Sequence, residues 1–203
     1  MINREEHTRA LMDHDRQYRA GGMVVAGMDE AGRGPLAGNV VTACVVMPDE
    51  PLIHWIDDSK KLSEFRREKI FQEILDLALY VGIGMAAPEE IDRINILQAT
   101  KSAMRRAAGK VPADVFLIDA VKDLGLQGRE IPIIKGDALS YNIAAASIVA
   151  KVTRDRQMRE LDERYPQYGF ARNKGYGTRE HIDALQKYGP CPEHRTTFIG
   201  HFI

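Results

Sequence analysis

Five short apolar runs rich in β-branched residues constrain the fold most strongly. The first two follow each other closely, whereas the later ones alternate with segments of helical periodicity. Early strands in succession and later strands alternating with helices are typical of an α/β domain with a mixed sheet. The five runs cover residues 23–32, 39–48, 79–87, 115–120 and 131–137.

Helical patterns fill most of the chain between these runs. Ser63, Ser140 and Thr178 stand where a helix N-cap is expected. Asn95 or Ile96 restarts a helix that begins at Pro88. The expected helices cover 3–20, 64–79, 88–108, 140–165 and the residues from 178 to 189.

Composition excludes several classes of protein. Of 203 residues, 44% are hydrophobic and 28% charged, and the net charge is −1, so no overall attraction to polyanions is expected. The two cysteines are far apart, which argues against a disulfide framework or structural zinc and favours the reducing cytoplasm. The longest uncharged run, 34–48, is shorter than the ~18 apolar residues of a membrane span. We therefore expect a soluble cytoplasmic protein with no targeting signal and no membrane contact.

Acidic residues end several of the apolar runs. Asp29 and Glu30 end the first, Asp119 ends the fourth, and Asp137 follows the fifth. Strand ends at one edge of a sheet converge, and converging carboxylates repel one another unless cations neutralise them. Four carboxylates balance two divalent cations, and oxygen-only ligands select Mg²⁺ or Mn²⁺ over zinc. Any one of these acids alone would be read as a solvated loop residue, but together they predict a two-metal site.

The glycine-rich segment after the first run is the next candidate. Side chains of Asp29 and Glu30 leave a strand on opposite faces, so both reach one site only if the strand bends there. Gly32 and Gly34 favour such a bend and let the backbone approach a ligand, with Arg33 beside them as a fork for phosphate. The segment lacks the GK[ST] ending of a phosphate loop, and a plain turn between two strands is the alternative.

Two kinds of basic segment could contact phosphates. Ser59, Lys60 and Lys61 precede the second expected helix, whose amide donors and dipole make a usable phosphate site. A capped helix with solvated lysines is an equally good interpretation. Basic clusters within 96–113 and 151–156 are candidate contacts to a nucleic-acid backbone, although charge runs on helices are more often solvated faces.

The segment 166–178 has no periodicity and is rich in glycine and aromatic residues, which is typical of a functional loop. Tyr176 lies between two glycines and close to Lys174, a combination suited to contact with a sugar beside a phosphate. The alternative is a loop pinned to the core by its aromatic residues, which we expect of Phe170.

Nucleophilic catalysis finds little support in the sequence. His181 and His194 are isolated, and neither a Ser-His-Asp nor a Cys-His arrangement is evident. Cys44 lies within an apolar run, so we expect it to be inert.

Six segments together resemble the ribonuclease HII family. They keep the family's motif order and cover nearly the whole chain from about residue 23, and the set is specific although no single motif would be. The chain is too short to hold the extra amino-terminal domain of the related ribonuclease HIII. The segments are GMDEAGRGPLAG (27–38), DDSKKLSE (57–64), FLIDA (116–120), KGD (135–137), IAAASIVAKVTRDRQM (143–158) and YGFARNKGYGT (168–178).

The resemblance implies a ribonuclease-H-like α/β fold, in which a mixed β-sheet is flanked by helices and followed by a small helical C-terminal part. We expect an N-terminal helical extension (1–22), a catalytic domain (23–165), and a C-terminal loop and helix that complete the substrate site (166–203). Family members hydrolyse the RNA strand of RNA–DNA hybrids and nick duplex DNA 5′ to an embedded ribonucleotide. We expect a monomer, and a sliding clamp is a candidate partner.

The family's functional residues fall on positions already singled out. Its four metal-binding acids coincide with the four acids at strand ends, its Gly-Arg-Gly motif with residues 32–34, and its recognition tyrosine with Tyr176. Two residues depart from the family pattern: Asn173 stands where a histidine is usual, and Asn39 where a proline is usual.

We expect hydrolysis rather than attack by the ribose 2′-OH. Two divalent cations would activate a water for in-line attack and stabilise the departing 3′ oxygen, giving 5′-phosphate and 3′-OH ends. Specificity has to come from the 2′-OH, which the backbone of residues 32–34 and Tyr176 would surround. The alternatives are another metal-dependent nuclease of the same superfold, such as a junction resolvase or exonuclease, and a non-catalytic nucleic-acid-binding module. Bare carboxylates repel phosphates, which argues against the second.

Overall fold

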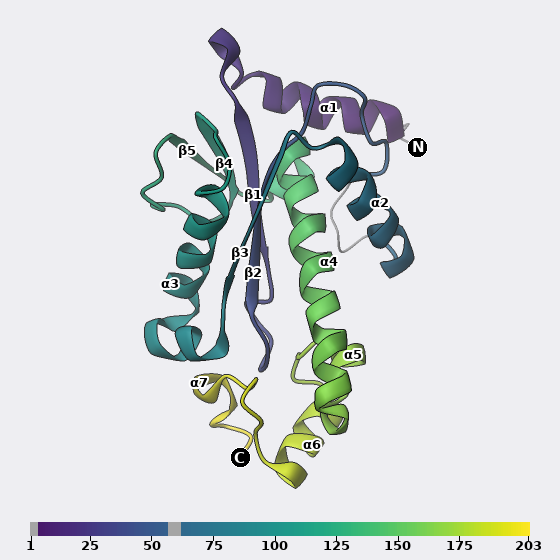
Figure 1. Cartoon of the computed structure of the whole chain (residues 1–203), viewed down its shortest axis with the longest axis vertical. Coiled ribbons are helices and arrows are strands. Elements are labelled where there is room, and N and C mark those ends of the chain that lie inside the picture. The colour runs from purple at the N-terminus through teal and green to yellow at the C-terminus, as the bar shows by residue number, and fades with distance from the viewer. Residues whose placement is uncertain (1–3, 57–61) are drawn as a thin grey trace.

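The computed structural model describes residues 4–56 and 62–203, and a five-stranded sheet forms its centre (Figure 1). The strands are β1 (Val25–Ala31), β2 (Val40–Val46), β3 (Tyr80–Ala86), β4 (Val115–Asp119) and β5 (Arg129–Ile133). Their order across the sheet is β3-β2-β1-β4-β5. β2 pairs antiparallel with β1 and β3, whereas β4 pairs parallel with β1 and β5. The predicted mixed sheet is therefore confirmed.

Three helices, α2, α4 and α6, begin at a residue whose side chain caps the first turn. Side-chain oxygens of Ser63, Ser140 and Thr178 each accept the backbone N–H three residues further on, as predicted for N-caps. The third helix is interrupted at Asn95, whose φ of 65° breaks the helical path at the predicted restart. The helices are α1 (Arg4–Arg16), α2 (Glu64–Leu77), α3 (Pro88–Ala108), α4 (Tyr141–Arg164), α5 (Phe170–Asn173), α6 (Arg179–Tyr188) and α7 (Thr196–Ile199).

The sheet is buried on both faces. In Figure 1 α4 runs along one face and α3 covers the other. Alternate residues of β2 belong to two different apolar cores: Ala43 and Val45 pack on the α4 side, and Cys44 and Val46 on the α3 side. Because successive side chains of a strand point to opposite faces, burial on both sides explains why β2 is a continuous apolar run.

A glycine lets α4 approach β1 closely. A Cβ atom on Gly27 would lie 2.1 Å from the backbone carbon of Asn142 and 2.2 Å from the nitrogen of Ile143. The start of α4 is also tied to α1, because the Asp15 carboxylate accepts the backbone and side-chain N–H groups of Asn142 at 2.8 Å. These contacts bring the middle of α4 past the end of β1, where the acids lie.

Parallel pairing places two acids side by side at one edge of the sheet. Met28 of β1 is paired with Ile118 of β4. Asp29 and Asp119 are the next residue on each strand, so both lie at the carboxyl ends of neighbouring parallel strands.

The C-terminal part contains more helix than predicted. Residues 166–178, expected to be an irregular loop, include a 3-10 turn (Pro166–Tyr168) and the single-turn helix α5, and α7 is a second unpredicted turn. Elements of four residues are too short to show helical periodicity in a sequence. Phe170 is completely buried, which confirms its predicted role as the anchor of this segment.

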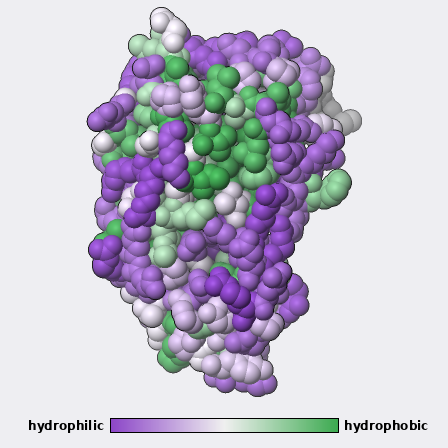
Figure 2. Space-filling model, viewed as in Figure 1, coloured by the Kyte–Doolittle hydropathy of each residue, from purple (hydrophilic) through white to green (hydrophobic). Residues whose placement is uncertain are grey.

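The surface in the view of Figure 2 is mostly hydrophilic, with hydrophobic residues gathered beside the upper part of the sheet. Leu79 and Tyr80, at the start of the edge strand β3, are among the exposed apolar side chains. None of the helices in the described ranges is long and apolar enough to cross a membrane.

Candidate active site

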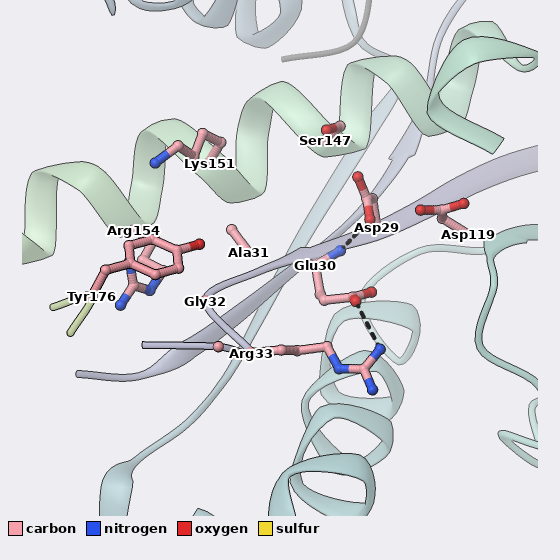
Figure 3. A pocket seen from close by; sticks show the side chains of 11 residues that line it. Asp29, Glu30, Ala31, Gly32, Arg33, Asp119, Ser147, Lys151, Arg154 and Tyr176 are labelled. Atoms are coloured by element: carbon pink, nitrogen blue, oxygen red, sulfur yellow. Dashed lines mark hydrogen bonds and ion pairs between the residues drawn. The ribbon is translucent and has the colours of Figure 1, made fainter. Parts of the chain in front are cut away.

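A cavity of about 320 Å³ lies where β1 ends (Figure 3). Its lining consists of residues 29–34, Asp119, three side chains of α4 and Tyr176. The structure therefore gathers in one place three of the predicted acids, the Gly-Arg-Gly segment and the predicted recognition tyrosine.

The two adjacent acids reach this cavity without the predicted bend between them. In Figure 3 the Asp29 side chain points toward α4, and that of Glu30 points the other way. β1 stays paired with β2 as far as Ala31, and the chain bends only at residues 33–34. Both side chains nevertheless line the cavity.

Asp137 lies next to this group of acids but does not line the cavity. It is buried in the 3-10 turn Gly136–Ala138, which follows β5. The backbone N–H of Gly136 donates to Oδ1 of Asp119 at 2.7 Å. The fourth predicted acid thus follows directly after a residue that is hydrogen-bonded to the third.

The surroundings of Asp29 disfavour its negative charge, and a bound cation would relieve this. Burial, then the neighbouring charges of Glu30 and Asp119, raise the pKa of Asp29 well above its ordinary value, although hydrogen bonds from Ser147 and the Glu30 amide oppose this. A cation bound here would offset both the burial and the repulsion. The donors are carboxylate oxygens, which fit Mg²⁺ or Mn²⁺. Within the described ranges no three carboxylate, imidazole or thiol groups are already arranged around one point as metal ligands.

Arg33 is paired with an acid in this arrangement. Its Nη1 lies 3.3 Å from Oε1 of Glu30, and its side chain extends away from Tyr176 (Figure 3). The Arg33 side chain is 42% exposed, so the ion pair contributes about 0–1 kcal/mol. Exchanging this partner for a phosphate therefore costs little free energy.

Tyr176 lies directly against the glycine-rich segment. A Cβ atom on Gly34 would be 3.7 Å from Cε1 of the tyrosine ring, and the tyrosine is 48% exposed. Asn173 organises the turn before it: Nδ2 donates to the carbonyl of Tyr168 at 2.6 Å, and Oδ1 accepts the Gly175 N–H at 2.8 Å. The departure at Asn173 from the family pattern thus supplies both a donor and an acceptor to this loop.

One face of α4 contributes residues that the sequence did not fully reveal. Ser147, Lys151 and Arg154 line the cavity. Lys151 and Arg154 belong to a basic cluster predicted to contact nucleic acid, whereas Ser147 was not predicted. The spacing i, i+4, i+7 places all three on one side of a helix and is the signal that could have identified the serine.

The other predicted phosphate contacts lie elsewhere. Arg156 points away from the cavity and bonds Glu68 of α2 at 2.6 Å. The basic cluster within 96–113 is mostly on α3, across the sheet from α4, and none of its members lines the cavity. Ser59, Lys60 and Lys61 lie outside the described residues, so their role in phosphate binding stays a prediction.

The expectation that the two C-terminal histidines are isolated is wrong. Nε2 of His181 lies 3.0 Å from Nε2 of His194, and Nδ1 of His181 lies 2.9 Å from the carbonyl oxygen of Tyr176. The pair forms because the chain turns back after α6, which brings residues 13 positions apart into contact. The backbone of Tyr176, the predicted recognition tyrosine, is thereby tied to the C-terminal turn.

Hydrogen bonding assigns one tautomer to each ring. A carbonyl only accepts, so His181 carries its hydrogen on Nδ1 and accepts at Nε2 from His194. His194 then accepts the Cys191 N–H on Nδ1 at 3.0 Å. Burial lowers the pKa of both histidines, that of His194 to about 4, and raises the pKa of the Cys191 thiol. The Cys191 Sγ also lies 3.2 Å from the His194 Nδ1, but with the thiol pKa raised this contact does not produce an activated thiolate.

Comparison with known proteins agrees with this site. The sequence model of the family described as Ribonuclease HII matches residues 26–202. Ribonuclease HII of Acetivibrio thermocellus is 55% identical over 188 residues, which cover 92% of this chain and 73% of that protein. Ribonuclease HII of Geobacter metallireducens is 54% identical over 184 residues, covering 90% of this chain and 86% of that protein.

Solved structures show the same architecture. The RNase HII in a complex with PCNA from Archaeoglobus fulgidus superposes with a TM-score of 0.75 at 25% identity, covering 88% of this chain and 96% of that one. Ribonuclease H2 from Pyrococcus horikoshii superposes with a TM-score of 0.70 at 30% identity, and the match covers 86% of this chain and 93% of that one. Bst-RNase HIII in complex with Mn²⁺ shares the fold, with a TM-score of 0.63 at 15% identity over 89% and 68% of the two chains. With its sequence matched from residue 26 to 202 and its fold shared with these enzymes, the chain belongs to the ribonuclease HII family.

Proposed function

We propose that this chain hydrolyses the RNA strand of RNA–DNA hybrids and nicks duplex DNA 5′ to embedded ribonucleotides. Ribonucleases HII are metal-dependent endonucleases that act at such sites. The observation that carries the proposal is the position of Asp29, Glu30 and Asp119 in the same cavity as a glycine-rich segment and an exposed tyrosine. Carboxylates alone repel a phosphate, whereas this neighbourhood supplies contacts to a nucleotide.

Asp29, Glu30, Asp119 and Asp137 would hold two divalent cations, Mg²⁺ or Mn²⁺. Bound there, such ions supply positive charge at the scissile phosphate and make a water more acidic. The chain itself orients the acids: Ser147 and the Glu30 amide bond Asp29, and the Gly136 amide bonds Asp119. Support for Asp137 is its place next to Gly136, just outside the cavity.

The remaining cavity residues would read the nucleotide. The backbone of residues 32–34 and the Tyr176 ring lie on adjoining walls of the cavity, where a ribose could be enclosed between them. Arg33, paired with Glu30, and Lys151, paired with Asp155 at 2.6 Å, would exchange these partners for the phosphates on either side. Hydrolysis at this position leaves a 5′-phosphate on the ribonucleotide and a 3′-OH on the preceding nucleotide.

The test is cleavage of a labelled DNA duplex that contains one ribonucleotide, beside an all-DNA duplex of the same sequence. We expect a single nick in the first duplex only, with Mg²⁺ or Mn²⁺ present, and none in EDTA. Equal cleavage of both duplexes would instead favour a junction resolvase or an exonuclease of the same superfold. Binding of both without cleavage would favour a non-catalytic module.

Three further proposals concern the setting of this activity. A sliding clamp is the proposed partner, supported by the PCNA complex of the Archaeoglobus fulgidus neighbour. The proposed location is the cytoplasm, supported by the free thiols of Cys44 and Cys191. The proposed state is a monomer, which light scattering would show as a mass near 22.8 kDa.

We propose that the chain has three parts. These are an N-terminal extension (1–22), a catalytic domain (23–165) and a C-terminal part (166–203) that completes the substrate site. Support for this division is that Tyr176, from the C-terminal part, forms a wall of the same cavity as the acids of β1 and β4.

A further inference from the structure

Two arginines are buried beneath the loop that joins β1 to β2. Arg154 of α4 is 1% exposed, and Arg195, just before α7, is 0% exposed. Neither guanidinium forms an ion pair with a carboxylate of the described residues. Asp92 attracts the Arg195 charge, but its carboxylate oxygens accept hydrogen bonds from the next two residues, Thr196 and Thr197. A buried charge without an ion pair is costly, so a position for such an arginine needs a specific reason.

The Arg195 guanidinium directs all of its hydrogen bonds to the loop between β1 and β2. A guanidinium group has five N–H donors in a rigid plane. Five hydrogen bonds of 2.6–3.0 Å run from Arg195 to backbone carbonyl oxygens within seven consecutive residues. The acceptors are the carbonyl oxygens of Gly32, Arg33, Pro35 and Gly38, the last of which accepts twice.

Arg154 joins the same loop to the segment that carries the tyrosine. Its guanidinium donates to the carbonyl oxygens of Ala37 at 3.1 Å, Asn39 at 3.0 Å and Lys174 at 2.9 Å. Gly32, with φ of 96°, makes room for it, because a Cβ atom there would lie 2.1 Å from the Arg154 Nε.

The direction of the carbonyls fixes the direction of the amides. In a trans peptide the C=O and N–H bonds point to opposite sides. Because the carbonyls of Gly32 and Arg33 point to Arg195, the N–H groups of Arg33 and Gly34 point away from it. Arg33 and Gly34 line the cavity and Arg195 does not, so that direction is toward the cavity.

We propose that Arg195, assisted by Arg154, is a positioning residue that presets this loop so that its amides meet the ribose and phosphate of the nucleotide to be cleaved. The substrate phosphate then brings negative charge close to two buried guanidinium groups that form no ion pair within the described residues. This inference rests on the proposed function and assigns a cause to its selectivity for ribonucleotides. Burial lowers the pKa of Arg195 to about 9, which leaves the group charged at neutral pH.

The test compares equilibrium binding of two fluorescent duplexes that differ in one 2′-OH, with Ca²⁺ in place of Mg²⁺ and a gel to check that both duplexes stay intact. Arg195→Lys keeps the charge but loses the five-donor plane. Arg106→Lys is the matched control, because this exposed arginine also bonds a carbonyl and lies on α3, away from the cavity. The melting temperature of each variant sets a temperature at which all are folded.

We expect the wild type and Arg106→Lys to bind the ribonucleotide-containing duplex more tightly than the all-DNA duplex. In Arg195→Lys we expect this preference to fall at least tenfold or to vanish, with affinity for all-DNA duplex unchanged. A purely structural role would lower both affinities together, and that result, or an intact preference, would overturn the proposal while leaving the proposed function standing. If the wild type itself shows no preference in binding, the proposal is overturned, and the cleavage test above decides separately whether the proposed function stands. If Arg195→Lys does not fold, Arg154→Lys is tested in its place. Loss of the preference would support the proposal, and an intact preference or an equal fall in both affinities would overturn it.

Discussion

The backbone N–H of Gly136 donates to Oδ1 of Asp119 across 2.7 Å. This bond joins the end of β4 to the turn that follows β5, and so links the acid in the cavity to the turn that carries Asp137. The fit is tight, because a Cβ atom on Gly136 would lie 2.5 Å from Cδ1 of Ile143 and 3.4 Å from the Asp119 oxygen. The relative placement of two predicted metal ligands therefore depends on a residue without a side chain.

Gly136→Ala should reduce activity strongly while the protein still folds. The added methyl group displaces the tip of Ile143, at a cost to the free energy of unfolding of about 1–3 kcal/mol. It also moves the turn that holds Asp137, so we expect activity to fall more than tenfold while the protein still folds. Gly200→Ala is the control, because nothing lies within 4 Å of the added atom. Wild-type activity of Gly136→Ala in saturating Mg²⁺ would show that this turn does not set the metal site.

Asp29→Asn and Asp137→Asn should each retain the fold and lose nearly all activity. The raised pKa of Asp29 means that, without metal, its ionisation destabilises the fold as the pH rises above the ordinary aspartate range. Asp29→Asn should therefore melt at a higher temperature than the wild type at neutral pH in EDTA. Calorimetry with Asp76→Asn, an exposed acid of α2, as the control measures this, and an unchanged or lower melting temperature would speak against repulsion at Asp29.

Tyr176→Phe and Tyr176→Ala should distinguish ring contact from hydrogen bonding. Loss of the hydroxyl alone should cost ~0.5–1.5 kcal/mol of transition-state stabilisation if the bond it makes is neutral. Loss of the ring should cost more, and more on a one-ribonucleotide duplex than on a continuous hybrid, where no deoxyribose follows the cut. Values of kcat/KM for both variants on both substrates decide between these contributions. Equal activity of Tyr176→Ala and the wild type on the first duplex would make the tyrosine a loop anchor only.

The His181–His194 pair should make stability depend on pH. Both pKa values lie below the ordinary histidine value when the protein is folded, so the unfolded chain binds more protons between about pH 4 and 6.5. Stability should be complete above pH 6.5 and fall on acidification, by roughly 1–3 kcal/mol in total. His194→Gln should flatten this slope, and His201→Gln, at an exposed position, should not. A wild-type slope retained in His194→Gln would exclude the pair as its source.

Local signals predicted most of the framework. Caps such as Ser63 and Ser140 act within one helical turn, and the break at Asn95 is likewise a property of a few neighbouring residues. The acids at strand ends could be grouped because parallel strands such as β1 and β4 end at one edge. Each of these features depends on a few neighbouring residues, so it can be predicted from the sequence alone.

Long-range contacts escaped prediction for the opposite reason. Arg195 is a charged residue in a polar tail sequence, and only the fold reveals that it is buried against a loop about 160 positions earlier. The pairing of His181 with His194 depends on the turn after α6, whose path no periodicity encodes. The position of Asp137 outside the cavity lining likewise depends on a 3-10 turn too short to predict.

The central claim is that the four acids support hydrolysis at a ribonucleotide by a water molecule and not by the ribose 2′-OH. The most direct measurement is mass spectrometry of the ends formed when the wild type nicks a duplex with one ribonucleotide in Mg²⁺. We predict a 5′-phosphate on the fragment that begins with the ribonucleotide and a 3′-OH on the other fragment. A 2′,3′-cyclic phosphate at the cut would identify the ribose hydroxyl as the nucleophile and contradict the account.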